Sequence, residues 1–218
     1  IKKSVYEKIE QFRKPGTLVS SNTSGIPINM LVEGRSDDFK KYFAGTHFFN
    51  PVRYLPLLEI IPTNDTDSEI VKFYMEYGAK FLGKTTVLAK DTPAFIANRI
   101  GVFSMMNLLH EVKNLGLNVT DIDKLTGPVI GRPKSATFRT ADVVGLDTLV
   151  HVAQGVEKSG VEAQNFNDVF KLPDYIQKMM ENKWLGSKTE QGFFKKVKNA
   201  EGKSEIHGLN LDTMEYEL

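Results

Sequence analysis

The sequence contains no cysteine among its 218 residues. Disulfide bonds, thiolate metal sites and cysteine nucleophiles are therefore excluded from this chain. No run of apolar residues approaches the ~20 that a bilayer-spanning helix needs, so we expect no membrane segment. The 28 basic and 27 acidic residues nearly cancel, which gives no reason to expect nucleic acid as a partner. A reducing, cytoplasmic environment is compatible with the lack of cysteine, and we expect it.

What is present indicates a globular protein. Apolar residues make up 41% and charged residues 25% of the chain, and the length suits one or two domains. The chain begins directly in an amphipathic helical pattern, with Val5, Ile9 and Phe12 on one side. It has neither a methionine start nor a signal-peptide pattern, and we expect it to be a piece of a longer protein.

The order of elements predicts an α/β region followed by a helical one. We expect helices over residues 1–13, 69–82, 94–115, 135–142, 146–157 and 173–181, and strands over residues 17–20, 42–49, 55–61 and 85–89. Residues 193–197 and 205–208 form a weaker candidate for a hairpin. The helix over 69–82 carries an apolar stripe that we expect to face the core, namely Ile70, Phe73, Tyr74, Tyr77 and Phe81. We place the domain boundary at a hinge near residue 90, giving domains 1–90 and 91–218.

A polar loop, residues 21–25, follows the first expected strand. In open parallel sheets ligands bind beyond the carboxyl ends of strands, so Asn22 and Ser24 are placed to hydrogen-bond a ligand. The same composition also fits a Ser/Asn turn that satisfies only its own backbone.

His47 and Glu59 are candidates for a catalytic pair. His47 lies near the end of one expected strand and Glu59 lies within the next, and an Asn-Pro turn separates the two strands. Such a turn can bring the two side chains together. Imidazole titrates near pH ~6.5, and a carboxylate on its other nitrogen would fix the tautomer. The pattern alone also fits a partly buried histidine and an unrelated surface glutamate.

Five segments, in the same order, resemble the L-3-hydroxyacyl-CoA dehydrogenase family. They are SSNTSG at 20–25, GTHFFNP at 45–51 with a glutamate 12 residues after its histidine, KDTPAFIANR at 90–99, VGLDT at 144–148 and KTEQGFF at 188–194. The resemblance implies a Rossmann-like NAD-binding domain followed by a helical C-terminal domain. The Gly-x-Gly-x-x-Gly turn of the family is absent, so we expect only the later part of the NAD-binding domain. Residues 131–140 resemble the larger fused β-oxidation proteins.

The family resemblance also implies an activity and a set of site residues. A 3-hydroxyacyl-CoA would be oxidised to the 3-ketoacyl-CoA in fatty-acid β-oxidation, with NAD as hydride acceptor. His47 matches the general base, Glu59 its orienting partner, and Ser24 and Asn98 the residues that hold the substrate oxygen. The positions that match or adjoin the cofactor are Asn22, Ser24, Asn50 and Lys188. We expect no metal.

The expected partners are an acyl-CoA substrate and either a second copy in a homodimer or further domains of a larger chain, with no nucleic acid and no membrane. Two alternatives stay open. The chain could be inactive by itself and act as a helical dimerisation module, a reading that the long apolar pattern over 94–115 favours. It could also belong to a dehydrogenase of 3-hydroxy acids that are not CoA thioesters.

Overall fold

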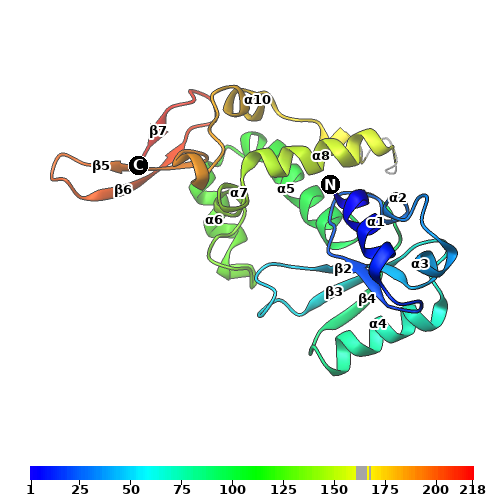
Figure 1. The fold of residues 1–218 in the computed structure, drawn as a ribbon. Coiled ribbons are helices and arrows are strands. Elements are labelled where there is room, and N and C mark those ends of the chain that lie inside the picture. Colours follow the sequence, from blue (N-terminus) through cyan, green and yellow to red (C-terminus); the bar gives the residue numbers. More distant parts are fainter. Residues whose placement is uncertain (161–165, 167) are drawn as a thin grey trace. The chain divides into compact units, whose positions relative to one another are not determined.

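The computed structural model describes residues 1–160, 166 and 168–218, and the chain divides into two compact units, Ile1–Arg99 and Ile100–Leu218 (Figure 1). The first unit contains a four-stranded sheet with helices, and the second contains helices and a smaller sheet. Within the described ranges, no helix has both the length and the apolar composition needed to cross a membrane.

The sheet of the first unit confirms the four expected strands. In spatial order they are β1 (Val19–Ser21), β2 (Phe43–Phe48), β3 (Leu57–Pro62) and β4 (Thr85–Leu88). β1 and β2 are parallel, β2 and β3 antiparallel, and β3 and β4 parallel. The carboxyl ends of β1 and β2 therefore lie at the same end of the sheet as the amino ends of β3 and β4.

Three helices cover one face of this sheet: α1 (Lys2–Phe12), α2 (Ile28–Leu31) and α3 (Asp37–Lys41). Side chains alternate along a strand, so Phe43, Gly45 and His47 share this face with Ile61 and Glu59. The core between helices and sheet is made by Tyr6, Ile28, Leu31, Val32, Phe39, Phe43, Ile61, Ala89 and Phe95. His47 and Glu59 thus lie on the face that holds the main core of this unit.

The other face of the sheet packs against α4 (Ser68–Lys80), which Asp67 caps by accepting a hydrogen bond from the Glu69 amide. A Cβ on Gly78 would lie 2.6 Å from Thr86 Cγ2, so the helix approaches the sheet where it has no side chain.

The helix α4 buries only part of the stripe that its sequence predicted: Ile70 and Tyr74 are partly buried, and the Tyr74 hydroxyl donates a hydrogen bond to the Val19 carbonyl (3.3 Å), but the other three are exposed. Phe73, Tyr77 and Phe81 are 45%, 43% and 74% exposed. Their rings form a stacked row along the outside of the helix, with centroids 5.5 and 5.2 Å apart. The buried face is centred on Gly78 instead, because only there can the helix backbone come close to the strands.

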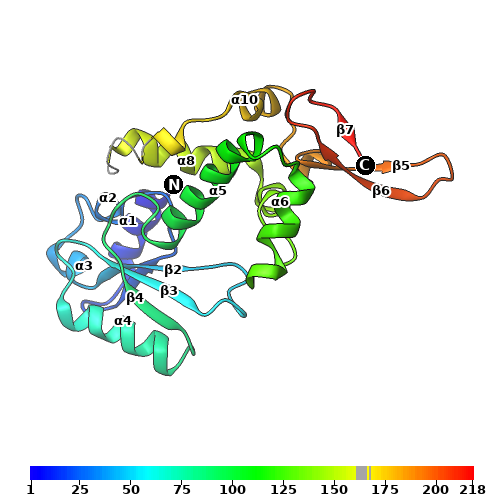
Figure 2. The same ribbon diagram turned by 180° about the vertical axis from the view of Figure 1, so that it is seen from behind.

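The second unit is mostly helical, as expected (Figure 2). Its elements are α5 (Ala97–Asn114, which starts in the first unit), α6 (Val119–Thr126), η1 (Pro128–Ile130), α7 (Phe138–Val144), α8 (Leu146–Ser159), η2 (Asp168–Phe170), α10 (Asp174–Glu181), η3 (Ser187–Thr189), β5 (Phe194–Lys198), β6 (Ser204–Leu209) and β7 (Tyr216–Glu217). The predicted hairpin is confirmed as β5 and β6. The third strand, β7, pairs with β6 and was not predicted. The only tryptophan of the chain, Trp184, lies here.

A buried carboxylate fixes the loop that leads into β5. Asp142 on α7 is 1% exposed and accepts hydrogen bonds from the amides of Phe193 (2.8 Å) and Phe194 (2.9 Å). The loop passes so close that a Cβ on Gly186 would lie 2.6 Å from Asp142 Cα, and a Cβ on Gly192 would overlap the carboxylate. Glycine is therefore required at both positions.

The raised pKa of Asp142 predicts that the free energy of unfolding depends on pH. Burial raises the pKa of Asp142 from 3.8 to about 6, although the amides of Phe193 and Phe194 act in the opposite direction. The folded protein therefore keeps this proton to a higher pH than the unfolded chain does. The stabilisation by this proton is complete below about pH 4 and is lost as the pH rises through about 6. A pKa difference of about two units corresponds to at most about 3 kcal/mol.

The test compares the wild-type chain with Asp142→Asn by urea unfolding at pH 4 and at pH 7. Asparagine is always neutral, so the free energy of unfolding of the wild type minus that of the variant should fall between the two pH values. A difference that is the same at both pH values would show that folding does not raise the pKa of Asp142.

Candidate active site

His47 and Glu59 lie directly opposite each other on β2 and β3. The Nδ1 atom of His47 is 2.7 Å from Oε2 of Glu59, and the two residues are 5% and 0% exposed. The structure therefore brings together the pair that the strand–turn–strand pattern placed side by side. Both side chains are buried, which rules out the reading of a surface glutamate.

The second oxygen of Glu59 binds the backbone. Oε1 accepts hydrogen bonds from the amides of Ile96 (3.1 Å) and Ala97 (2.8 Å), where α5 begins. The positive end of a helix dipole stabilises a carboxylate at this place. Burial alone would raise the pKa of Glu59, but the hydrogen bonds from His47, Ala97 and Ile96 outweigh burial, and the pKa lies below its usual value.

These contacts define the state of the imidazole. Because Glu59 is ionised, it accepts a hydrogen bond, and Nδ1 of His47 carries the hydrogen. In the neutral imidazole, Nε2 then keeps its lone pair. A histidine in this tautomer, with a fixed carboxylate behind it, can take a proton from a hydroxyl group and stabilise the resulting positive charge.

Two phenylalanine rings pack on the imidazole. The centroids of Phe49 and Phe95 lie 4.5 and 5.5 Å from that of His47. Phe95 is buried in the core, and it and Ala94 have φ values of 49° and 60°. The helix predicted from residue 94 therefore begins only at Ala97. The left-handed turn directs the amides of Ile96 and Ala97 toward Glu59.

The polar loop after β1 is held at both ends. At its start, Oδ1 of Asn22 accepts a hydrogen bond from the amide of Phe48, at the end of β2 (2.9 Å). At its far end, Asp91 accepts hydrogen bonds from the amides of Ile28 (2.7 Å) and Asn29 (2.8 Å) at the start of α2. Ser24 lies exposed between these two anchors. The Asn22 oxygen is used within the protein, which leaves its NH₂ group for a ligand.

Asp91 was not predicted as part of this region, and its loss should loosen the loop. It also accepts a hydrogen bond from Nδ2 of Asn29 (2.7 Å), so one carboxylate satisfies three donors. We expect Asp91→Ala to lower the free energy of unfolding of the first unit by about 1–3 kcal/mol. Thermal unfolding measures this, with Asp65→Ala as a control on the same unit; an unchanged midpoint for Asp91→Ala would contradict the anchoring role.

The remaining predicted residues are distributed over both units. Asn98 lies in the first turn of α5, directly after the amide of Ala97 that binds Glu59. Asn50 is exposed just beyond the end of β2, and its peptide bond to Pro51 is cis. Lys188 belongs to η3 in the second unit, where its amine forms a salt bridge of 2.5 Å with Asp147. Asp147 itself lies in the VGLDT segment, which could have indicated such a partner.

Comparison with known proteins gives the family. Residues 1–92 match the family model described as "3-hydroxyacyl-CoA dehydrogenase, NAD binding domain", and residues 95–196 match "3-hydroxyacyl-CoA dehydrogenase, C-terminal domain". A relative from Bacillus subtilis named "Probable 3-hydroxyacyl-CoA dehydrogenase" is 51% identical over 99% of this chain, which covers 26% of that relative. One of the same name from Deinococcus radiodurans is 45% identical over 91% of this chain and 56% of its own length.

Solved structures agree with this assignment. The crystal structure of M. tuberculosis FadB2 has a TM-score of 0.78 at 28% identity, over 90% of this chain and 66% of that one. The (S)-3-hydroxybutyryl-CoA dehydrogenase PaaH1 from Ralstonia eutropha has a TM-score of 0.76 at 25% identity, over 88% and 64%. This chain spans about a quarter to just over half the length of the two curated relatives above. It belongs to the 3-hydroxyacyl-CoA dehydrogenase family, with part of a Rossmann-like NAD-binding domain followed by a mainly helical C-terminal domain.

Proposed function

We propose that the protein containing this chain oxidises an L-3-hydroxyacyl-CoA to the 3-ketoacyl-CoA in fatty-acid β-oxidation. The observation that carries the proposal is the buried pair of His47 and Glu59, whose free Nε2 can receive the proton of the 3-hydroxyl group. Glu59 holds the imidazole and stabilises its charge after the transfer. In the reverse direction His47 returns the proton to the oxygen.

The polar residues that follow β1 can hydrogen-bond part of the cofactor NAD. NAD, when bound, supplies the acceptor for the hydride that leaves the substrate carbon. The NH₂ group of Asn22, the hydroxyl of Ser24 and the amide of Asn50 can hydrogen-bond an amide or a ribose. Ser24 and Asn98 hold the substrate oxygen in this proposal. Lys188 would have to exchange its bond to Asp147 for one to NAD.

The proposal also assigns a role to each domain and places the protein in the cell. Residues 1–90 contribute to the cofactor domain, and residues 91–218 form a domain for substrate binding and subunit contact. The substrate is an acyl-CoA, and the chain works in the cytoplasm, either as a homodimer or within a larger multidomain protein. Relatives named as trifunctional enzymes or α subunits of fatty-acid oxidation complexes support the last arrangement.

The experiment follows NADH consumption with acetoacetyl-CoA, for the 218-residue chain and for the longest natural form of the protein that contains it. We expect turnover by the longer form. Acetoacetate is assayed in parallel, because equal turnover of the free acid would instead favour a dehydrogenase of simple 3-hydroxy acids. If neither form consumes NADH, the proposed activity is wrong.

A further inference from the structure

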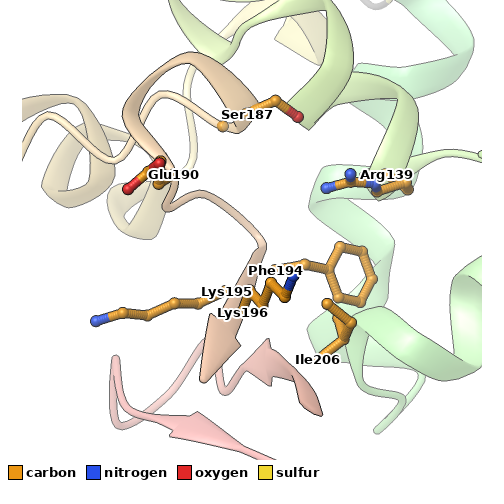
Figure 3. Close-up of a pocket in the computed structure, with 8 residues that line it drawn as sticks. Arg139, Ser187, Glu190, Phe194, Lys195, Lys196 and Ile206 are labelled. Carbon is orange, nitrogen blue, oxygen red and sulfur yellow. The ribbon is translucent and has the colours of Figure 1, made fainter. Parts of the chain in front are cut away.

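The second unit contains a pocket of about 340 Å³ that shares no residue with the site around His47 (Figure 3). It is formed where the loop before β5 meets α7 and the β5–β6 hairpin. The side chains that define its chemistry are Arg139, Ser187, Glu190, Phe194, Lys196 and Ile206. Two of them, Glu190 and Phe194, belong to the KTEQGFF segment, and Ser187 directly precedes it. The proposed reaction gives that segment no role beyond Lys188.

The pocket has an excess of positive charge. Arg139 and Lys196 are exposed, and neither forms an ion pair with any residue that the structure describes. A third cation, Lys195, lines the pocket, with its amine 5.4 Å from the centre of the Tyr216 ring. The lining contains a single carboxylate, Glu190. Arg139 interacts electrostatically with Asp123 and Asp142, but its guanidinium forms no ion pair with either carboxylate. Guanidinium and ammonium groups outside ion pairs favour a phosphate as ligand.

Beside these charges lies an apolar surface. Lys196 pairs with Ile206 across the hairpin, and Phe194 lies two residues before Lys196 on the same face of β5. Ile206 is 59% exposed. In Figure 3 the ring of Phe194 lies between Arg139 and Ile206, while Lys195 extends away on the other side. An aromatic ring next to an exposed aliphatic side chain is a surface on which a planar base can stack.

The loop that supplies the polar groups is rigid. Gly186 and Gln191 exchange two backbone hydrogen bonds of 2.9 and 3.2 Å, and Asp142 holds the residues that follow. The backbone that carries Ser187 and Glu190 is therefore in place at the pocket before any ligand arrives. A preformed site loses less conformational entropy on binding. A hydroxyl and a carboxylate can both bind the hydroxyl groups of a ribose.

We propose that this pocket binds a phosphorylated nucleoside. The base stacks on Phe194 and Ile206, and a phosphate binds Arg139 and Lys196. The volume lies within the range usual for small-molecule sites, ~300–1,000 Å³. A free nucleotide and the nucleotide end of coenzyme A share this chemistry, whereas inorganic phosphate supplies only the charge. The inference goes beyond the proposed dehydrogenase activity and does not depend on it.

Isothermal titration calorimetry tests the proposal. The 218-residue chain is titrated with adenosine 3′,5′-bisphosphate, with ADP and with inorganic phosphate. We expect saturable binding of the two nucleotides, with inorganic phosphate at least about tenfold weaker because it cannot stack. The better of the two nucleotides identifies the source: adenosine 3′,5′-bisphosphate represents the end of coenzyme A, and ADP an ordinary nucleotide. Arg139→Gln and Lys196→Gln should each weaken nucleotide binding about tenfold.

The matched control is Lys198→Gln, which removes the same charge two residues further along the same face of β5, outside the pocket lining. It should leave the affinity unchanged. Arg139 and Lys196 are exposed, so the variants should fold, and circular dichroism checks this. The absence of saturable nucleotide binding would overturn the proposal, and so would an equal loss of affinity in Lys198→Gln. Equal affinity for inorganic phosphate would show that no nucleoside is recognised.

Discussion

Replacing Glu59 with glutamine should reduce turnover on the order of 10²–10⁴-fold, about as much as removing the imidazole in His47→Ala, because both changes remove the general base. Glutamine keeps an oxygen for the amides of Ile96 and Ala97. Its NH₂ group then faces Nδ1 of His47, which must become an acceptor. The hydrogen moves to Nε2, and the nitrogen that should take the proton has no lone pair left.

The measurement is kcat for the forward reaction in the active form of the protein, for both single variants and the double variant. Because the two residues act as a unit, the double variant should lose little more activity than His47→Ala alone. Losses that multiply would show that Glu59 acts independently of His47. Full activity of His47→Ala would remove the basis of the proposed mechanism.

Replacing Gly186 with alanine should destabilise the second unit on the order of 3 kcal/mol. Gly186 has a φ of 97°, which L-residues rarely adopt, and its Cβ would meet the backbone of Asp142 at 2.6 Å. A backbone atom cannot move aside as the end of a flexible side chain can. The loop must shift away from α7, and the hydrogen bonds of Asp142 to Phe193 and Phe194 would be strained with it.

Gly160→Ala is the matched control, because Gly160 has a φ of 61° but no atom of the described residues lies within 4 Å of its Cβ position. It should lose only the cost of the left-handed conformation, about 1–2 kcal/mol. Urea unfolding followed by the fluorescence of Trp184 reports on the second unit, since the first unit contains no tryptophan. An equal loss in both variants would show that the contact with Asp142 carries no cost.

The contact between His47 and Glu59 could be predicted because it depends on local pattern. Two apolar runs of strand-forming residues, with an Asn-Pro turn between them, specify an antiparallel pair, and the alternation of side chains then places both residues on one face. The cap of α4 at Asp67 could be predicted for the same reason.

The features that could not be predicted depend on contacts between distant segments. Pro93 after a threonine is typical of a helix start, yet Ala94 and Phe95 are left-handed, because the helix begins where Glu59 can accept its first amides. In α4 the row of Phe73, Tyr77 and Phe81 has helical spacing, but the close approach at Gly78 decides which face is buried. Nothing in the segment around Gly78 indicates that close approach, and nothing in the segment around Glu59 indicates that its second oxygen accepts the first amides of α5.

The two oxygens of Glu59 have a consequence for how this site can change over successive generations. One oxygen holds the imidazole and the other holds the first amides of α5. A substitution at position 59 that changes the proton affinity of His47 therefore also changes where α5 begins. Variation that adjusts the chemistry is left to the neighbours of the pair, and Phe49, which packs against the imidazole but is only partly buried, is the position most open to it.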